Sequence, residues 1–454
     1  MRLTTVSQMT LPEGVVRSLE MRADVLEDAV LPISFDQRRH VGAGDRPGSW
    51  MAIAFRLPEQ AARSEIAEAW AAAVTRHAAL RTVFDRDAAG ELRLREARVE
   101  VAGWRLHDDA VGAHPREVLA GLFDARCRPF AAPSHLLCLV EPHDASADPD
   151  PRPIAVIASD HSHVDMWSLL VLARDLEAGI QDLHDGRGPE TAPAPAFADH
   201  TRLLAAQPPA PAAVAARWAE VLDAGGGAMP RFPLPLGDPA RTARAVVGVD
   251  DILDADGLAA LTARAARSGV RVTALAMSAL ADATLALSGA PLRAVFPVHS
   301  RHGGRWDDAV GWFITNSVLE LGDPDPHACA AALRDAIRLG SYPLAPLLAP
   351  YGGMVEPHGM FALSWLDTRR MPVGVDAGFD VQYVSATVST DGVMVWFIVN
   401  DDGLHVRWRH PDTQAARTNV RAWVDAVADR LGGLRPGGPA PASAPIALRG
   451  GTTG

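Results

Sequence analysis

The stretch from Ile154 to Leu170, IAVIASDHSHVDMWSLL, decides the fold of this chain. It opens with an uninterrupted apolar run of strand length, residues 154–158, and passes without Gly or Pro into a polar group, Asp160-His161-Ser162-His163-Val164-Asp165. Apolar residues then recur at helical spacing from Met166 onward. This order predicts a buried strand that ends in a histidine and two carboxylates, which is where α/β proteins place much of their chemistry.

Length and composition set outer limits. The 454 residues exceed one ordinary core, and 48% of them are apolar, so we expect a globular protein of at least two domains. The net charge of -12 argues against nucleic acid or an anionic membrane as the main partner. Because all 43 basic residues are Arg, an anionic partner would have to meet a local arginine patch.

The ends of the chain and its cysteines indicate a compartment. Residues 1–14 lack the apolar core of a signal peptide, and no run of about 18 uncharged apolar residues follows, so we expect a cytoplasmic protein without a membrane span. Cys127, Cys138 and Cys329 are odd in number and widely spaced. We therefore expect buried reduced thiols, without a disulfide framework and without a metal site.

Turn-forming composition divides the chain. Residues 185–195, DGRGPETAPAP, forbid regular structure, and we place a domain boundary there: 1–187, 188–433 and a disordered tail at 434–454. A second breaker-rich segment at 225–239 predicts a surface connection. Expected strands lie at 50–57, 91–101, 136–140, 292–298, 361–366 and 393–399, and expected helices at 66–74, 255–267, 273–286 (capped by Thr273) and 413–431.

Several separate stretches carry a family resemblance. His161-xxx-Asp165 with Met166-Trp167-Ser168 resembles the HHxxxDG signature of the condensation-domain superfamily, which includes condensation domains of nonribosomal peptide synthetases, polyketide-associated acyltransferases and chloramphenicol acetyltransferase. Three further motifs of that family are similar to residues 34–38 (SFDQR), 76–84 (RHAALRTVF) and 310–316 (VGWFITN), in the family's order. His299-Ser300-Arg301 lies where the family has SGR. Three positions depart from the pattern: Asp160 stands for the first His, Met166 for the Gly, and Thr315-Asn316 for Asn-Thr.

The resemblance implies a fold and an activity. We expect two chloramphenicol-acetyltransferase-like α/β lobes in a V-shaped pseudo-dimer, with a tunnel at their junction. The activity implied is acyl or aminoacyl transfer from a phosphopantetheine thioester, on a carrier protein or coenzyme A, to an amine or alcohol in secondary-metabolite or lipid biosynthesis. We expect a free-standing monomeric enzyme with no bound cofactor.

The resemblance also assigns candidate residues. His161 is the candidate general base, since neutral imidazole can accept a proton near neutral pH. Asp165 is expected to pair with Arg301 across the lobes. Because adjacent strand residues point to opposite faces, we expect Asp160 to face away from the tunnel as a structural residue. The alternative is that its carboxylate accepts a ring N–H of His161, as the acid does in a catalytic triad. Oxyanion donors or substrate contacts are expected among the following residues: Met166, Trp167, Ser168, His163 (on the tunnel wall or facing solvent), Asn316 and Ser364.

Two alternatives stay open. Asp160 and Met166 are compatible with a catalytically inactive docking or scaffold member of the superfamily. His161-x-His163-x-Asp165 also matches the HxHxD start of a zinc hydrolase ligand set, although no further ligand motif follows it.

Overall fold

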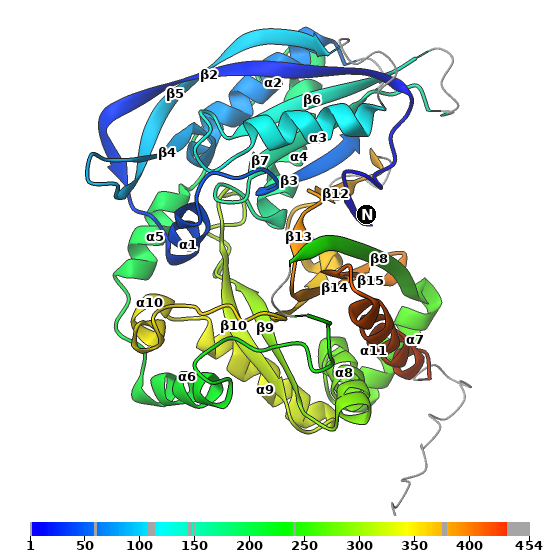
Figure 1. Ribbon diagram of the computed structural model, residues 1–454. Helices are drawn as coiled ribbons and strands as arrows, with labels where there is room; N and C mark the ends of the chain where they lie inside the picture. The colour runs from blue at the N-terminus through cyan, green and yellow to red at the C-terminus, as the bar shows by residue number, and fades with distance from the viewer. Residues whose placement is uncertain are drawn as a thin grey trace, which may run out of the picture.

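The computed structural model describes residues 2–58, 61–107, 114–143, 148, 150–238, 242–374 and 379–433. The chain forms two α/β lobes, each built on one curled sheet, and the N-terminus lies between them (Figure 1). This is the two-lobed chloramphenicol-acetyltransferase-like fold that the motif order implied. The predicted tail, 434–454, lies outside the described residues.

The first lobe contains an eight-stranded sheet in the order β1-β12-β3-β7-β6-β2-β5-β4. Its strands are β1 (Arg2–Thr5), β2 (Gly14–Leu31), β3 (Trp50–Arg56), β4 (Thr82–Arg86), β5 (Leu92–His107), β6 (His135–Pro142), β7 (Ile154–Asp160) and β12 (Gln382–Ser385). Its helices are α1 (Phe35–Gly42), α2 (Arg63–Arg76), the short η1 (Ala78–Arg81), α3 (Pro115–Arg126) and α4 (Met166–His184).

The unbroken apolar run of β7 reflects burial on both faces of this sheet. Ala155 and Ile157 belong to the core under α2 and α4, whereas Val156 and Ala158 belong to the core under α3. A strand covered on both faces needs apolar side chains at every position. The strand therefore ends in the middle of the lobe rather than at its surface.

The second lobe contains a seven-stranded sheet in the order β10-β9-β11-β14-β15-β8-β13. These strands are β8 (Ala243–Asp254), β9 (Leu292–His299), β10 (Ile314–Leu321), β11 (Phe361–Asp367), β13 (Ser389–Thr390), β14 (Val393–Asn400) and β15 (Gly403–Pro411). The remaining helices are α5 (Phe197–Ala205), α6 (Ala212–Ala224), α7 (Ala255–Arg267), α8 (Val272–Ser288), α9 (Pro326–Leu339), α10 (Leu344–Leu348), η2 (Ala349–Tyr351), η3 (Thr368–Arg370) and α11 (Gln414–Gly433).

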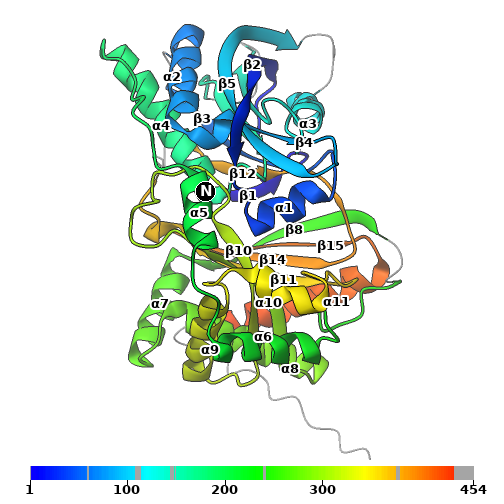
Figure 2. The ribbon, with the colours of Figure 1, turned by 90° about the vertical axis from the view of Figure 1, so that its left-hand side faces the viewer.

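Helices α7, α8 and α11 cover the outer face of the second sheet, and part of its other face is turned toward the first lobe (Figures 1 and 2). Helices α6 and α10 pack on that other face, over β9, β10 and β11. Side chains of β14 alternate between these faces. Val395 and Phe397 belong to the core shared with α7, α8 and α11, whereas Ile398 belongs to the core of the first lobe, and Trp396 packs against that core. The junction is thus lined by residues of both sheets.

One strand crosses between the lobes. β12 belongs to the second half of the sequence but pairs with β1 and β3 in the first sheet. The first lobe therefore contains a strand from the second half of the sequence, and a boundary at 187/188 does not separate the strands of the two sheets. Its use as a domain limit stays a prediction.

Most expected elements are present, but one helix start was wrong. Thr273 does not cap α8, because the helix begins at Val272 after the N-cap residue Arg271. The link from α7 is only four residues long, so the second helix starts as soon as the chain has turned. Within the described ranges no single helix is long and apolar enough to cross a membrane; α7 and α8 reach that length only as a pair bent by 97°.

Candidate active site

The polar group that follows β7 forms the turn into α4. Asp160 is the last residue of the strand, and Asp165 is the N-cap of the helix, where its carboxylate accepts a hydrogen bond from Ser168 N at 2.7 Å. His163 N donates to Asp160 O at 3.1 Å and closes the turn between them. The strand, turn and helix thus hold His161 at the junction of the lobes.

His161 has a fixed tautomer. Its Nδ1 lies 2.8 Å from the carbonyl oxygen of Val164, which can only accept, so Nδ1 carries the proton. Nε2 has no partner among the described residues and keeps its lone pair. The ring of Trp312 stacks on the imidazole with centroids 4.1 Å apart and planes at 17°. Burial lowers the pKa of His161, so the ring is neutral at neutral pH and can act as a base.

Asp160 is turned away from the His161 ring. Its carboxylate accepts hydrogen bonds from Ser162 N at 2.9 Å, from the Ser162 and Ser49 hydroxyls, and from His40 Nε2 at 3.2 Å. Burial alone would raise its pKa, but the His40 contact and these hydrogen bonds lower the pKa to about 2. The ionised carboxylate therefore connects the turn after β7 to Ser49, which precedes β3, and to His40 on α1.

His40, from α1, occupies a position that the sequence did not indicate. Arg46 Nη2 lies 3.1 Å from its Nδ1, and because a guanidinium only donates, Nδ1 is the acceptor and Nε2 carries the proton given to Asp160. The His40 ring meets His161 edge-on at 6.1 Å and Trp312 edge-on at 5.3 Å. His40 thus links the Asp160 carboxylate to the face of the candidate base.

Asp165 and Arg301 form a buried ion pair between the lobes. Arg301 Nη2 lies 3.1 Å from Asp165 Oδ1, and the two side chains are 0% and 2% exposed. Arg301 Nη1 donates to the carbonyl oxygens of Trp306 and Ala309, each at 2.6 Å. The guanidinium carbon also lies 3.9 Å from the centre of the Phe313 ring. The pair therefore ties the loop 301–313 of the second lobe to the start of α4.

The first turn of α4 carries the candidate oxyanion donors. The N–H groups of Met166 and Trp167 belong to the first helical turn, where backbone donors lack intrahelical acceptors. The ring of Trp167 donates to Asp307 O at 2.9 Å, and Gly311 N donates to the Ser168 hydroxyl at 3.0 Å. The side chains of Trp167 and Ser168 therefore bind the second lobe.

His163 does not face solvent, which was one of the two positions expected for it. It is 3% exposed, its Nδ1 lies 2.9 Å from the hydroxyls of both Ser134 and Ser162, and its ring packs edge-on against Phe84. Burial lowers its pKa to about 4, so it is a neutral core residue. Among the described residues no group of three His, Cys, Asp or Glu side chains is placed to hold a metal ion.

The two expected contacts on the second sheet come from its edge strand β10 and from the interior strand β11. Asn316 Nδ2 lies 3.5 Å from Asp36 Oδ1 on α1. Burial raises the pKa of Asp36 to about 6, although Arg39 at 3.7 Å opposes the shift. Ser364 on β11 pairs in register with Trp396 on β14 and so shares the sheet face turned toward the first lobe.

Comparison with known proteins now identifies the family. A condensation-domain model matches residues 43–332, well over half of the chain. The isonitrile lipopeptide synthase of Mycobacterium tuberculosis is 29% identical over 312 residues, which are 65% of this chain and 12% of that synthase. The chain therefore spans a small part of that relative's length.

Solved structures share the fold. PapA2 acyl transferase superposes with a TM-score of 0.80 at 18% identity, over 95% of this chain and 99% of that chain. A mutant starter condensation domain of rhizomide synthetase, in complex with C8-CoA, gives a TM-score of 0.63 at 15% identity, over 89% and 95%. The chain belongs to the condensation-domain family, and that membership indicates a transferase.

Proposed function

We propose that this chain is an acyltransferase in which His161 is the general base that moves an acyl or aminoacyl group from a thioester to an amine or hydroxyl acceptor. One observation carries the proposal. The Nδ1 proton of His161 is donated to the Val164 carbonyl oxygen, so the neutral ring keeps its lone pair on Nε2. This atom lies at the junction of the two lobes of a condensation-domain fold.

The proposed step balances as follows. Nε2 of His161 accepts the proton of the acceptor N–H or O–H while the acceptor atom bonds to the thioester carbonyl carbon. The tetrahedral intermediate then collapses, the C–S bond breaks, and the proton passes from His161 to the departing thiolate. A positioned base of this kind contributes roughly 10² to 10⁴ in rate.

The neighbours of His161 are given supporting roles in this proposal. The N–H groups of Met166 and Trp167 are candidates to stabilise the oxyanion, since the first turn of a helix favours negative charge. Asp165 and Arg301 are positioning residues, because they fix the start of α4 without touching the His161 ring in the described contacts. Trp312 fixes the plane of the base by stacking.

The donor is proposed as a phosphopantetheine thioester. The supporting observations concern relatives: one solved condensation domain was captured with C8-CoA, and the curated relative is a lipopeptide synthase. Coenzyme A and a carrier protein present the same thioester, so either can be the donor. The acceptor is proposed as a small-molecule amine or alcohol.

The test is an assay of acyl transfer from octanoyl-CoA to a panel of amines and alcohols, in which release of the free thiol is measured. We expect His161→Ala to lower the transfer rate by at least about 10² while the melting temperature stays unchanged. The matched control is His358→Ala, since His358 is an exposed histidine paired with Asp391 and should leave the rate unchanged. Equal rates for wild type and His161→Ala would overturn the proposal, and absence of transfer from any CoA or carrier-protein thioester would favour the docking or scaffold alternative.

A further inference from the structure

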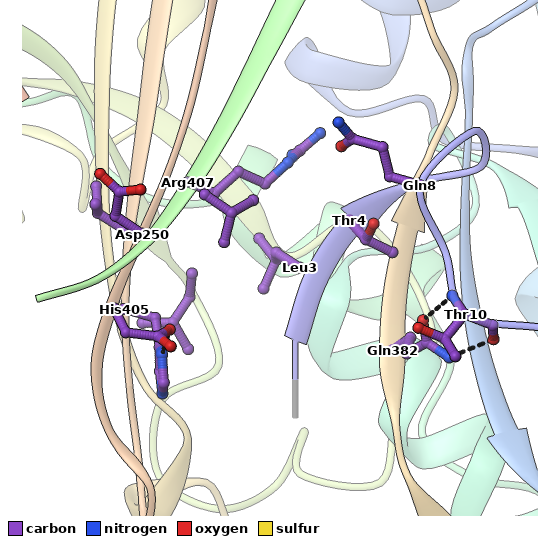
Figure 3. A pocket seen from close by; sticks show the side chains of 12 residues that line it. Leu3, Thr4, Gln8, Thr10, Asp250, Gln382, His405 and Arg407 are labelled. Atoms are coloured by element: carbon purple, nitrogen blue, oxygen red, sulfur yellow. Dashed lines mark hydrogen bonds and ion pairs between the residues drawn. The ribbon is translucent and has the colours of Figure 1, made fainter. Parts of the chain in front are cut away.

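A second site lies between the lobes, at a cavity that the proposed chemistry does not use. The cavity has a volume of about 610 Å³ and is lined by β1 and the turn after it from the first lobe and by β8, β14 and β15 from the second (Figure 3). That volume is within the range of small-molecule sites, roughly 300 to 1,000 Å³. Its lining mixes apolar side chains such as Leu3 and Ile398 with polar ones such as Gln8 and Arg407.

Arg407 is a buried cation without a carboxylate partner among the described residues. It is 4% exposed, its Nη2 donates to the Ser385 hydroxyl at 2.8 Å, and its Nε has no hydrogen-bond acceptor. The guanidinium carbon lies 4.7 Å from the centre of the Trp396 ring. Burial, with Arg409 nearby, lowers the pKa of Arg407 to about 10, which still leaves it charged at neutral pH.

A second arginine strengthens the positive charge at this place. Arg409 follows two residues later on β15, so its side chain leaves the same sheet face, and it lies 5.9 Å from the Trp396 ring. Its Nε is also buried without an acceptor, and its Nη2 contacts the Met394 sulfur. Two like charges thus lie against one indole ring, and of the two arginines only Arg407 lines the cavity, where an anion beside it would offset their repulsion.

The acidic residues at the cavity do not supply that anion. Asp250 pairs in register with Val406, so it points to the opposite sheet face, where it binds Arg421 at 2.7 Å. Asp251 is exposed and binds His405 at 2.6 Å. In Figure 3 the guanidinium end of Arg407 instead points toward the side-chain amide of Gln8 across the open space.

We propose that this cavity binds the carboxylate of a small-molecule substrate, with Arg407 as its principal ligand and the Gln8 amide as a second donor. A guanidinium presents parallel N–H groups that match the two oxygens of a carboxylate. The carboxylate of Asp251, which pairs in register with His405 on the Arg407 side of the sheet, disfavours a doubly charged phosphate at the cavity. The cavity's apolar side chains, including Leu3 and Ile398, are suited to the carbon chain that carries the acid.

The proposal deepens the proposed function, on which it rests only for the statement that the ligand is a substrate. Trp396, which stacks with Arg407, packs against the same core as Met166 and Trp167 at the start of α4. The cavity beside Arg407 and the start of α4 therefore border one continuous hydrophobic core.

Calorimetric titration with sodium butyrate, butyramide and inorganic phosphate tests the site without any turnover. We expect butyrate to bind and its neutral isostere butyramide not to bind. Arg407→Gln should weaken butyrate binding at least about tenfold, since a hydrogen-bonded ion pair is lost. Arg407→Lys should keep part of the affinity. The matched control Arg430→Gln, which removes a surface arginine paired with Asp282, should leave the affinity unchanged.

Each outcome decides one point. Undiminished butyrate binding by Arg407→Gln, or no anion binding by the wild type, overturns the site. Tighter binding of phosphate than of butyrate overturns the carboxylate assignment. His161→Ala should bind butyrate as the wild type does, so loss of transfer in that variant with retained binding separates the two proposals. If Arg407→Gln does not fold, Gln8→Glu provides the second variant, because a carboxylate beside Arg407 should compete with butyrate and weaken its binding.

Discussion

Two buried arginines at the junction of the lobes have opposite surroundings. Arg301 and Arg407 each stack on an aromatic ring, Phe313 at 3.9 Å and Trp396 at 4.7 Å. Arg301 is also bonded to the Asp165 carboxylate and to two backbone carbonyl oxygens. Arg407 has a single described hydrogen bond, to the Ser385 hydroxyl.

This difference distinguishes an arginine that stabilises the fold from an arginine whose charge can still bind a ligand. The Nε atoms of both arginines are buried without an acceptor, so the difference lies in the counter-ion. A buried charge with a counter-ion holds the elements that carry its partners, whereas a buried charge without one favours binding of an anion. Stacking on an aromatic ring is worth about 0.5 to 2 kcal/mol and offsets only part of the cost of burial. Arg301 is therefore assigned to the architecture of the site, and Arg407 to a ligand.

The largest effect is expected where the satisfied pair is broken. Asp165→Ala leaves Arg301 buried without its carboxylate and also removes the N-cap of α4, so it should lower the free energy of unfolding by about 3 to 5 kcal/mol. Urea denaturation monitored by tryptophan fluorescence measures this change. Equal unfolding free energies for the variant and the wild type would refute the structural role of the pair.

Asp36 is a buried carboxylate that has an arginine neighbour but is only partly compensated by it, so it lies between the two arginines in this comparison. Asp36 faces Arg39 at 3.7 Å, but burial still raises its pKa to about 6 from 3.8. Because the pKa of Asp36 is higher in the folded than in the unfolded protein, ionising Asp36 destabilises the fold. The free energy of unfolding should therefore fall by up to about 3 kcal/mol as pH rises from about 4 through about 6.

Asp36→Asn should therefore raise the unfolding free energy at pH 8, and the difference from the wild type should disappear near pH 4. Urea denaturation at a series of pH values measures it. A stability difference that does not depend on pH would show that Asp36 has no raised pKa in the folded protein.

The smallest effect is expected at the unpaired arginine. Arg407→Met breaks no ion pair and replaces a buried charge by an apolar side chain that fits against Trp396, so it should change the unfolding free energy by less than about 1 kcal/mol or raise it. The same urea experiment compares it directly with Asp165→Ala. A loss as large as that of Asp165→Ala would mean that Arg407 is a structural residue like Arg301.

Local pattern was sufficient to predict the elements that carry the site. The apolar run of residues 154–158 and the periodic residues after Asp165 predicted β7 and α4, because a strand buried on both faces and a core helix each leave a direct trace in sequence. The pairing of Asp165 with Arg301 came from the family resemblance, since the sequence alone does not show which residues meet across 136 positions.

Contacts that depend on topology could not be predicted. His40 reaches Asp160 across 120 positions and lies just after the SFDQR motif, with no spacing that links the two. His163 was expected on the tunnel wall or facing solvent, but the turn after β7 directs the His161 ring to the junction and buries the His163 ring against Phe84. The crossing of β12 to the first sheet has the same origin, because four residues carry no signal of which sheet they join.

The pH dependence of kcat/KM for acyl transfer tests the central claim, that neutral His161 is the base. Burial lowers the pKa of His161 below its ordinary value near 6.5, so activity should be lost as pH falls through an apparent pKa below 6.5 and should be level above it. The residual activity of His161→Ala should lack this acidic limb. An apparent pKa above 6.5, or the same limb in His161→Ala, would contradict the account.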